Sequence, residues 1–234
     1  MRNVLLVSWL LLPVGAWAYH EGPGQDRKAL ESMDKVLVAA HDAASAGRWK
    51  AAVQGFTKAL ESQPKNADAL RAATVQRIQL ELAKARMQDG ANDEARPQLE
   101  DLVDTIAGTE DHHPQLLAEA RQALARSQFY NTWLLRLEGF DRDVWEPEIE
   151  AARQNWRLLA EQAGDGPAAA QHRQDLEAAI RLERMAMEDL QGMPLPKQCK
   201  GCCSCNGKKP SKKKTQGKPK PGASSGPQFD TGGS

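Results

Sequence analysis

The sequence predicts an all-α fold for most of its 234 residues. Three observations lead to this prediction. Ala, Leu, Glu, Gln and Arg dominate the middle of the chain, while aromatic residues make up only 5%. Glycine and proline cluster toward the ends. Runs that alternate apolar and polar residues with period two, as half-buried strands do, are almost absent.

The first 18 residues have the three parts of a secretory signal peptide. Arg2 supplies a positive charge, Val4 to Gly15 form an apolar stretch, and Ala16-Trp17-Ala18 matches an A-x-A cleavage site. The apolar stretch is shorter than the roughly 20 residues that span a bilayer, so we expect cleavage and no transmembrane segment in the mature chain. The prediction is an exported protein, periplasmic or extracellular in a bacterial host, with a polar leader over residues 19–26.

Residues 33–66 carry the most specific pattern in the chain. Helices are predicted over about 27–46 and 49–63, with Gly47 at the turn between them. In the second helix, one face is apolar and contains Ala52, Phe56, Ala59 and Leu60. The charged and amide residues lie away from that face. A single hairpin of this kind cannot bury its apolar face alone, so stacked neighbours are expected.

The same stretch resembles one tetratricopeptide repeat, a helix-turn-helix unit of 34 residues. The matching positions are, in order, Ala39, Ala40, Gly47, Trp49, Ala52, Phe56, Ala59 and Pro64. Ala43 departs from the pattern, because a tyrosine is common there, and predicts looser packing between the helices. The resemblance implies a right-handed α-solenoid of about three helix pairs with a C-terminal capping helix, together spanning residues 27–191. It also implies a groove that binds a peptide or protein segment.

Further helices are predicted over about 67–88 and 94–106. The inner stripe of the second of these contains Leu99, Leu102, Val103 and Ile106. His112 and His113 follow in a loop. Adjacent residues diverge on a helix and no second ligand stands four positions further on, so we expect a solvated loop rather than a metal site.

A long helix is predicted from Pro114 to Glu138, with Gly139 ending it. Its stripe contains Leu116, Ala120, Ala123, Ser127, Tyr130, Leu134 and Leu137. Asp143 and Glu146 have the spacing of a capping box and are expected to begin the next helix. The inner residues of that helix are Trp145, Ile149, Ala152, Trp156, Leu159 and Ala163. Aromatic residues at helical spacing are more often core than ligand cage.

Pro167 begins the last predicted helix, which runs to about Gln191. Its stripe contains Leu176, Ala179, Leu182, Ala186 and Leu190. Many charged residues flank this stripe, which suits a terminal helix whose outer face meets water. We therefore expect this helix to cap the solenoid.

Residues 192–234 are rich in Gly, Pro, Ser and Lys and are predicted to be disordered. From residue 197 onward the chain has nine lysines and one acidic residue, a net charge of +8. Residues 19–196 carry 21 basic and 30 acidic residues, a net charge of −9. Such a tail can fold back on the acidic body, bind an anionic surface such as lipid headgroups, or stay solvated.

The tail also holds all four cysteines, in a C-x-x-C-C-x-C pattern made by Cys199, Cys202, Cys203 and Cys205. An even number of cysteines in an exported chain fits two small-loop disulfides. Four thiolates can instead hold copper(I) or zinc, although structural zinc sites usually separate their cysteine pairs by a dozen residues or more. Disulfides, a bound metal ion and free thiols all remain open.

The predicted function is non-enzymatic binding. The chain has no phosphate-binding glycine loop, no G-x-S-x-G and no H-E-x-x-H, and no cofactor is expected beyond a metal ion at the cysteines. The basic tail lacks interleaved aromatic residues, which argues against nucleic acid as a ligand. The main hypothesis is a scaffold for another protein or peptide; the alternatives are metal handling by the cysteines and a tether to an anionic surface. The tetratricopeptide resemblance implies that the ligand is faced by His41, Ser45, Arg71, Val75 and Gln79.

Overall fold

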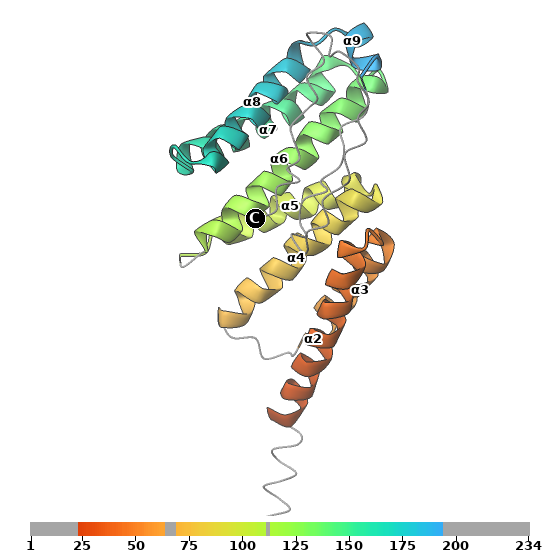
Figure 1. Ribbon diagram of the computed structural model, residues 1–234, viewed down its shortest axis with the longest axis vertical. Helices are drawn as coiled ribbons and strands as arrows, with labels where there is room; N and C mark the ends of the chain where they lie inside the picture. Colours follow the sequence, from red (N-terminus) through yellow and green to blue (C-terminus); the bar gives the residue numbers. More distant parts are fainter. Residues whose placement is uncertain (1–22, 64–68, 111–112, 194–234) are drawn as a thin grey trace, which may run out of the picture. The chain divides into compact units, whose positions relative to one another are not determined.

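The computed structural model describes residues 23–63, 69–110 and 113–193 (Figure 1). Every regular element in these ranges is an α-helix and none is a strand, as the composition predicted. None of these helices is both long and apolar enough to cross a membrane. The contacts divide the chain into two compact units, residues 1–82 and 83–234. The expected signal peptide and the cysteine-lysine tail lie outside the described residues.

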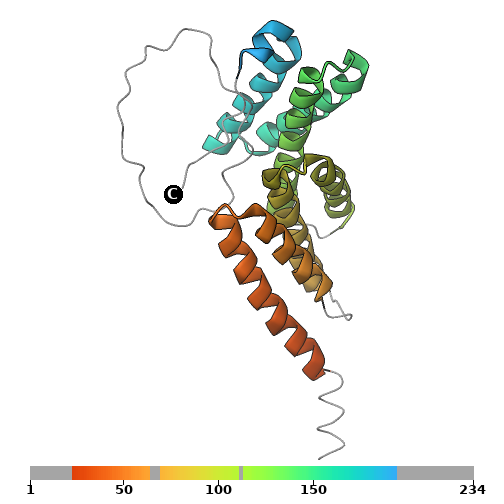
Figure 2. The same ribbon diagram turned by 90° about the vertical axis from the view of Figure 1, so that its right-hand side faces the viewer.

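The first unit contains a helical hairpin. Helix α2 (Pro23–Ser45) packs against α3 (Trp49–Glu61), and Figures 1 and 2 show the two side by side. Gly47 between them has a φ of 71°, a left-handed conformation that costs glycine little. The chain can therefore reverse within three residues. The polar leader expected over 19–26 is helical from Pro23 onward, since proline is well tolerated at the first helical position.

The inner face of the hairpin agrees with the predicted stripe except at Leu60, which is half-buried. Ala52, Phe56 and Ala59 of α3 are buried, as is Ala40 of α2. The two helices lie close together at Gly55, where an added Cβ atom would lie 2.7 Å from the Ala40 Cβ atom. The small residues at this crossing therefore allow backbone-to-backbone packing.

Helix α4 (Ala69–Asp89) begins in the first unit and ends in the second, because the boundary follows Leu82. Its C-terminal part is tied to both following helices. Arg86 Nε lies 3.4 Å from Glu94 Oε2 of α5 (Asn92–Ala107). Lys84 Nζ lies 3.8 Å from Glu119 Oε2 of α6 (Pro114–Leu137).

Helix α6 is the central helix of the second unit. It packs against α5, α7 (Arg142–Gln162) and α9 (Met187–Gln191). Residues 123–129 are consequently buried without interruption, a wider buried surface than the single predicted stripe. Tyr130 and Leu134, which were expected in that stripe, are only half-buried. Because other helices pack on several sides of α6, polar as well as apolar side chains of this helix are buried.

The predicted capping box of α7 is wrong. The helix begins at Arg142, and Asp141 occupies the N-cap position with extended backbone. Asp143 is already helical, so it cannot cap; its charge lies in the first turn, where the helix dipole favours an acid. Glu146 pairs with Arg142 instead, at 2.5 Å between Oε1 and Nη2. The predicted inner face is otherwise confirmed from Trp145 to Leu159, while Ala163 is half-buried.

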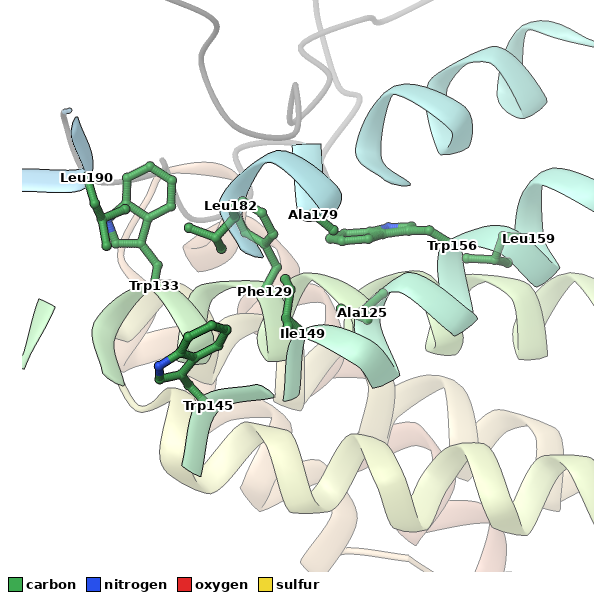
Figure 3. Packing of buried hydrophobic residues seen from close by; sticks show 11 residues of the cluster. Ala125, Phe129, Trp133, Trp145, Ile149, Trp156, Leu159, Ala179, Leu182 and Leu190 are labelled. Atoms are coloured by element: carbon green, nitrogen blue, oxygen red, sulfur yellow. The ribbon is translucent and has the colours of Figure 1, made fainter. Parts of the chain in front are cut away.

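The last predicted helix is two helices. Helix α8 (Pro167–Arg184) packs against α7, and Met185 and Ala186 then adopt extended backbone before α9 begins. Ala186, expected to be buried, is exposed as a result. Leu190 of α9 is fully buried in the main core cluster, where Figure 3 shows it next to the Trp133 indole of α6.

Candidate functional site

Two of the predicted groove residues lie on α2. His41 and Ser45 are both exposed and are separated by one helical turn. The His41 ring meets the Phe56 ring edge to face, with centroids 5.1 Å apart. The Ser45 hydroxyl donates to the carbonyl of Asp42 at 3.0 Å. His41 is therefore accessible while its ring is held against the core of the hairpin.

The other three groove residues, Arg71, Val75 and Gln79, follow one another at four-residue steps on α4. Val75 is half-buried and Gln79 is exposed. Residues at this spacing lie on one side of a helix. That the α2 and α4 residues line one shared groove stays a prediction.

The residues considered as metal ligands, of which only the cysteines were kept as candidates, lie mostly outside the described ranges. His113, at the N-cap position of α6, is exposed, while His112 and the four cysteines are not described. Within residues 23–63, 69–110 and 113–193, no three side chains of His, Cys, Asp or Glu come together in a way that could hold a metal ion. Metal binding by the cysteines stays a prediction.

Polar side chains inside the second unit connect three successive helices. Asn92 of α5 donates through Nδ2 to the Ser127 carbonyl at 3.2 Å, and the Ser127 hydroxyl donates back to Asn92 Oδ1 at 2.8 Å. Gln128 accepts through Oε1 from Asn155 Nδ2 of α7 at 3.2 Å. Of these four residues only Ser127 was predicted to be on an inner face, because it lies in the stripe of the long helix. Buried pairs of this kind specify which helix faces meet.

A second set of buried polar residues lies on α6 and α8. Arg126, His172 and Asp175 are all buried, and Asp175 Oδ1 accepts from Gln171 Nε2 at 3.1 Å. His172 Nδ1 has no hydrogen-bond partner among the described residues. Burial, and then the positive charge of Arg126, lower the pKa of His172. The neutral imidazole is therefore the form that this interior favours.

Two carboxylates, one on α5 and one on α7, pair with the same arginine of α5. Arg96 Nη1 lies 2.7 Å from Glu100 Oε1 and 3.4 Å from Glu148 Oε1. Burial raises the pKa of Glu148, and the nearby Glu100 raises it further, against the opposing effects of Arg96 and a hydrogen bond with Asn131. One arginine thus pairs with two carboxylates, and burial makes Glu148 easier to protonate than an exposed glutamate.

Arg136 is a buried cation with several partners. Its Nη1 donates to the Leu182 carbonyl and its Nη2 donates to the Met185 carbonyl, the latter at 2.6 Å. The guanidinium also lies over the Trp145 ring, 4.8 Å from the centroid. Helices α6, α7 and α8 therefore meet at this one side chain. The sequence held no signal for it beyond an arginine near the end of an apolar helix.

The helix pairs share a local geometry. After α2, α4 and α6 comes a glycine with positive φ, namely Gly47 (71°), Gly90 (92°) and Gly139 (81°). At each turn the next N–H donates to a carbonyl five residues earlier, over 2.9–3.0 Å. Five or six residues after each glycine begins a buried set spaced four and then three residues apart. The sets are Ala52, Phe56 and Ala59; Ala95, Leu99 and Leu102; and Trp145, Ile149 and Ala152.

Comparison with known proteins returns no match: no family model matches the chain, and no curated protein or solved structure is significantly similar to it. The geometry of the described helices is therefore the basis on which a function is proposed. Its two relevant features are the recurring helix pair and the exposed residues of α2 and α4.

Proposed function

We propose that this protein is an exported, non-enzymatic scaffold that binds a peptide or protein segment in a groove of tetratricopeptide-like helix pairs. The observation that carries the proposal is the recurrence of one turn and one buried spacing in α2–α3, α4–α5 and α6–α7. Repeated helix pairs are the building units of α-solenoids, whose stacked first helices form extended binding surfaces. Helix α8, which packs against α7, would be the capping helix.

The exposure of the groove residues supports the same proposal. His41, Ser45 and Gln79 are exposed on first helices of successive pairs, where a ligand could reach them. Imidazole, hydroxyl and amide groups all suit hydrogen bonding to a peptide backbone. Arg71 would add one positive charge, so an acidic or carboxylate-bearing segment is the favoured ligand.

Site-specific photocrosslinking in the exported fraction would test where the partner binds. A photoreactive residue at Ser45 or Gln79 should capture the same protein, while one at the exposed Gln54 of α3 should not. Ser45 and Gln79 are on first helices, whereas Gln54 is on a second helix and serves as the matched control. Equal capture at all three positions would contradict a groove on the first helices.

Charge reversal gives a second test once the partner is identified. Arg71→Glu should weaken binding at least about tenfold if Arg71 pairs with a ligand carboxylate, since charge-assisted hydrogen bonds contribute about 1.5–3 kcal/mol. Lys58→Glu makes the same charge change at an exposed position of α3 and should leave the affinity within about twofold. An unchanged affinity in Arg71→Glu would refute the proposed role of this residue.

The cysteine-lysine tail supports two alternatives from other classes of function. The C-x-x-C-C-x-C pattern suits metal handling, and stoichiometric copper or zinc that is lost after Cys-to-Ser changes would favour it. The nine lysines suit a tether to an anionic surface, and binding that weakens steeply with salt would favour that reading. Deleting residues 197–234 separates these alternatives from groove binding, which should survive the deletion.

A further inference from the structure

The break between α8 and α9 has no local cause in the sequence. From Leu182 to Gln191 the chain contains no glycine, no proline and no β-branched residue. Alanine, leucine, methionine and glutamate, which make up most of the segment, are strong helix formers. Yet Met185 has φ −67° and ψ 139°, and Ala186 has φ −70° and ψ 155°, both extended. The break must therefore be imposed by tertiary contacts.

Arg136 supplies those contacts by occupying the acceptors that a continuous helix would use. In an α-helix each carbonyl accepts from the N–H four residues further on. The Leu182 carbonyl would then accept from Ala186, and the Met185 carbonyl from Asp189. In the structure the Arg136 guanidinium donates to both carbonyls, and the Leu182 carbonyl also accepts from the Met185 N–H at 3.3 Å rather than from the Ala186 N–H. The broken arrangement and the continuous helix therefore use different donors at the same two oxygen atoms.

The broken arrangement has its own compensations. Arg136 is buried, and its charge is placed against the C-terminal carbonyls of α8 and the face of Trp145 rather than against a carboxylate of the described residues. Leu190 gains full burial beside Trp133 only because the chain turns at Ala186 (Figure 3). A charged group and an apolar anchor thus oppose the intrinsic tendency of the segment to stay helical.

We propose that Met185 and Ala186 form a two-state hinge, and that the hydrogen bonds from Arg136 stabilise its observed state. In one state α9 is docked on α6, as observed. In the other, α8 and α9 merge into one helix from Pro167 to Gln191, which withdraws Leu190 and uncovers Trp133. This device is independent of the proposed groove and would regulate access to the aromatic surface of α6.

Two substitutions push the hinge in opposite directions. Arg136→Met removes the competing donors and should favour the continuous helix. Ala186→Pro should lock the broken state, because the observed φ of −70° suits proline and the extended Met185 suits the residue before a proline. A proline at 186 cannot donate to the Leu182 carbonyl and would clash in a continuous helix.

The readout is NMR of the full-length mature chain. The ¹³Cα shifts of Met185 and Ala186 report extended or helical backbone, and hydrogen exchange at Ala186 and Asp189 reports whether their amides have gained helical acceptors. The wild type and Ala186→Pro should give extended shifts at Met185. Arg136→Met should move both shifts toward helical values and slow exchange at both amides at least tenfold. Combining the two changes should restore the extended shift at Met185.

Arg136→Lys is a second, milder variant that keeps the test valid if Arg136→Met does not fold. Lysine keeps the charge but lacks the fork that reaches two carbonyls, so a partial movement toward helical shifts is expected. Extended shifts and unchanged exchange in both Arg136 variants would overturn the proposal, because the break would then not depend on Arg136. A lower unfolding midpoint for Ala186→Pro than for the wild type would also overturn it.

Discussion

Gly55→Ala should destabilise the α2–α3 hairpin, although the same change in an open helix stabilises. At an unconstrained helical position, replacing glycine with alanine gains about 0.5–1 kcal/mol. At Gly55 the new methyl carbon would lie 2.7 Å from the Ala40 Cβ atom and 3.2 Å from its Cα atom. Carbon atoms pack best at about 3.5–4.0 Å, so a shortfall of about 1 Å must be relieved.

The relief cannot come from a side-chain rotation. Ala40 has no rotatable heavy atoms, so α2 and α3 must move apart, which loosens the packing of buried Phe56. Overpacking of this kind costs about 1–3 kcal/mol, and subtracting the helix-propensity gain leaves a net loss of about 0.5–2 kcal/mol. Urea unfolding followed through the backbone amide signals of α2 and α3 measures this difference directly.

Two further variants make this prediction sharp. Gln54→Ala, at the exposed neighbouring position, should change stability by less than about 0.5 kcal/mol. Adding Ala40→Gly to Gly55→Ala returns the missing space, so the double variant should lose less than the sum of the two single losses. A Gly55→Ala hairpin that is more stable than the wild type would refute the close approach on which the reasoning rests.

Three more predictions concern the second unit. Phe129→Ala, at a fully buried position, should lower the free energy of unfolding in urea by about 3–5 kcal/mol. Phe140→Ala, where the side chain is 48% exposed, should lower it by less than about 1 kcal/mol. Similar losses in the two variants would contradict the described core. Since burial lowers the pKa of His172 below its usual 6.5, the folded state binds fewer protons there, so stability should fall as pH drops below about 6.5. His172→Gln should shrink that fall between pH 7.5 and 5, and an equally large fall in the variant would contradict this. Burial raises the pKa of Glu148, so its ionisation opposes folding; Glu148→Gln should be more favourable relative to the wild type at pH 7 than at pH 4, and a difference independent of pH would contradict this.

Helix positions and most inner faces could be predicted from the sequence because they depend on local spacing. Ala52, Phe56 and Ala59, and likewise Trp145, Ile149 and Ala152, recur at steps of four and three, and all six are buried. Gly47 and Gly139 were expected at the turns for the same local reason, and both have positive φ. The proposed groove residues on α2 and α4 come from the register of one repeat and remain a prediction.

The polar interior could not be predicted in this way. Arg126, Gln128 and Arg136 lie outside the apolar stripe of α6, and only packing on several sides of that helix buries them. Gln128 pairs with Asn155 of α7, 27 residues away, and Arg136 pairs with the carbonyls of Leu182 and Met185, 46 and 49 residues away. No pattern within one helix reports such distant partners.

What the sequence determined by itself was the helical class, the turns and the buried spacing of each second helix, because these follow from side-chain periodicity and backbone preference within a few residues. What only the tertiary structure decided was where the last helix ends. Local propensity favours one helix from Pro167 to Gln191, but in the structure α8 ends at Arg184, and Arg136, from a helix about 50 residues earlier in the chain, donates to the Leu182 and Met185 carbonyls. In the proposed hinge, these charge-assisted hydrogen bonds, which form only when the chain folds, outweigh the helical hydrogen bonds that the Ala186 and Asp189 amides would make.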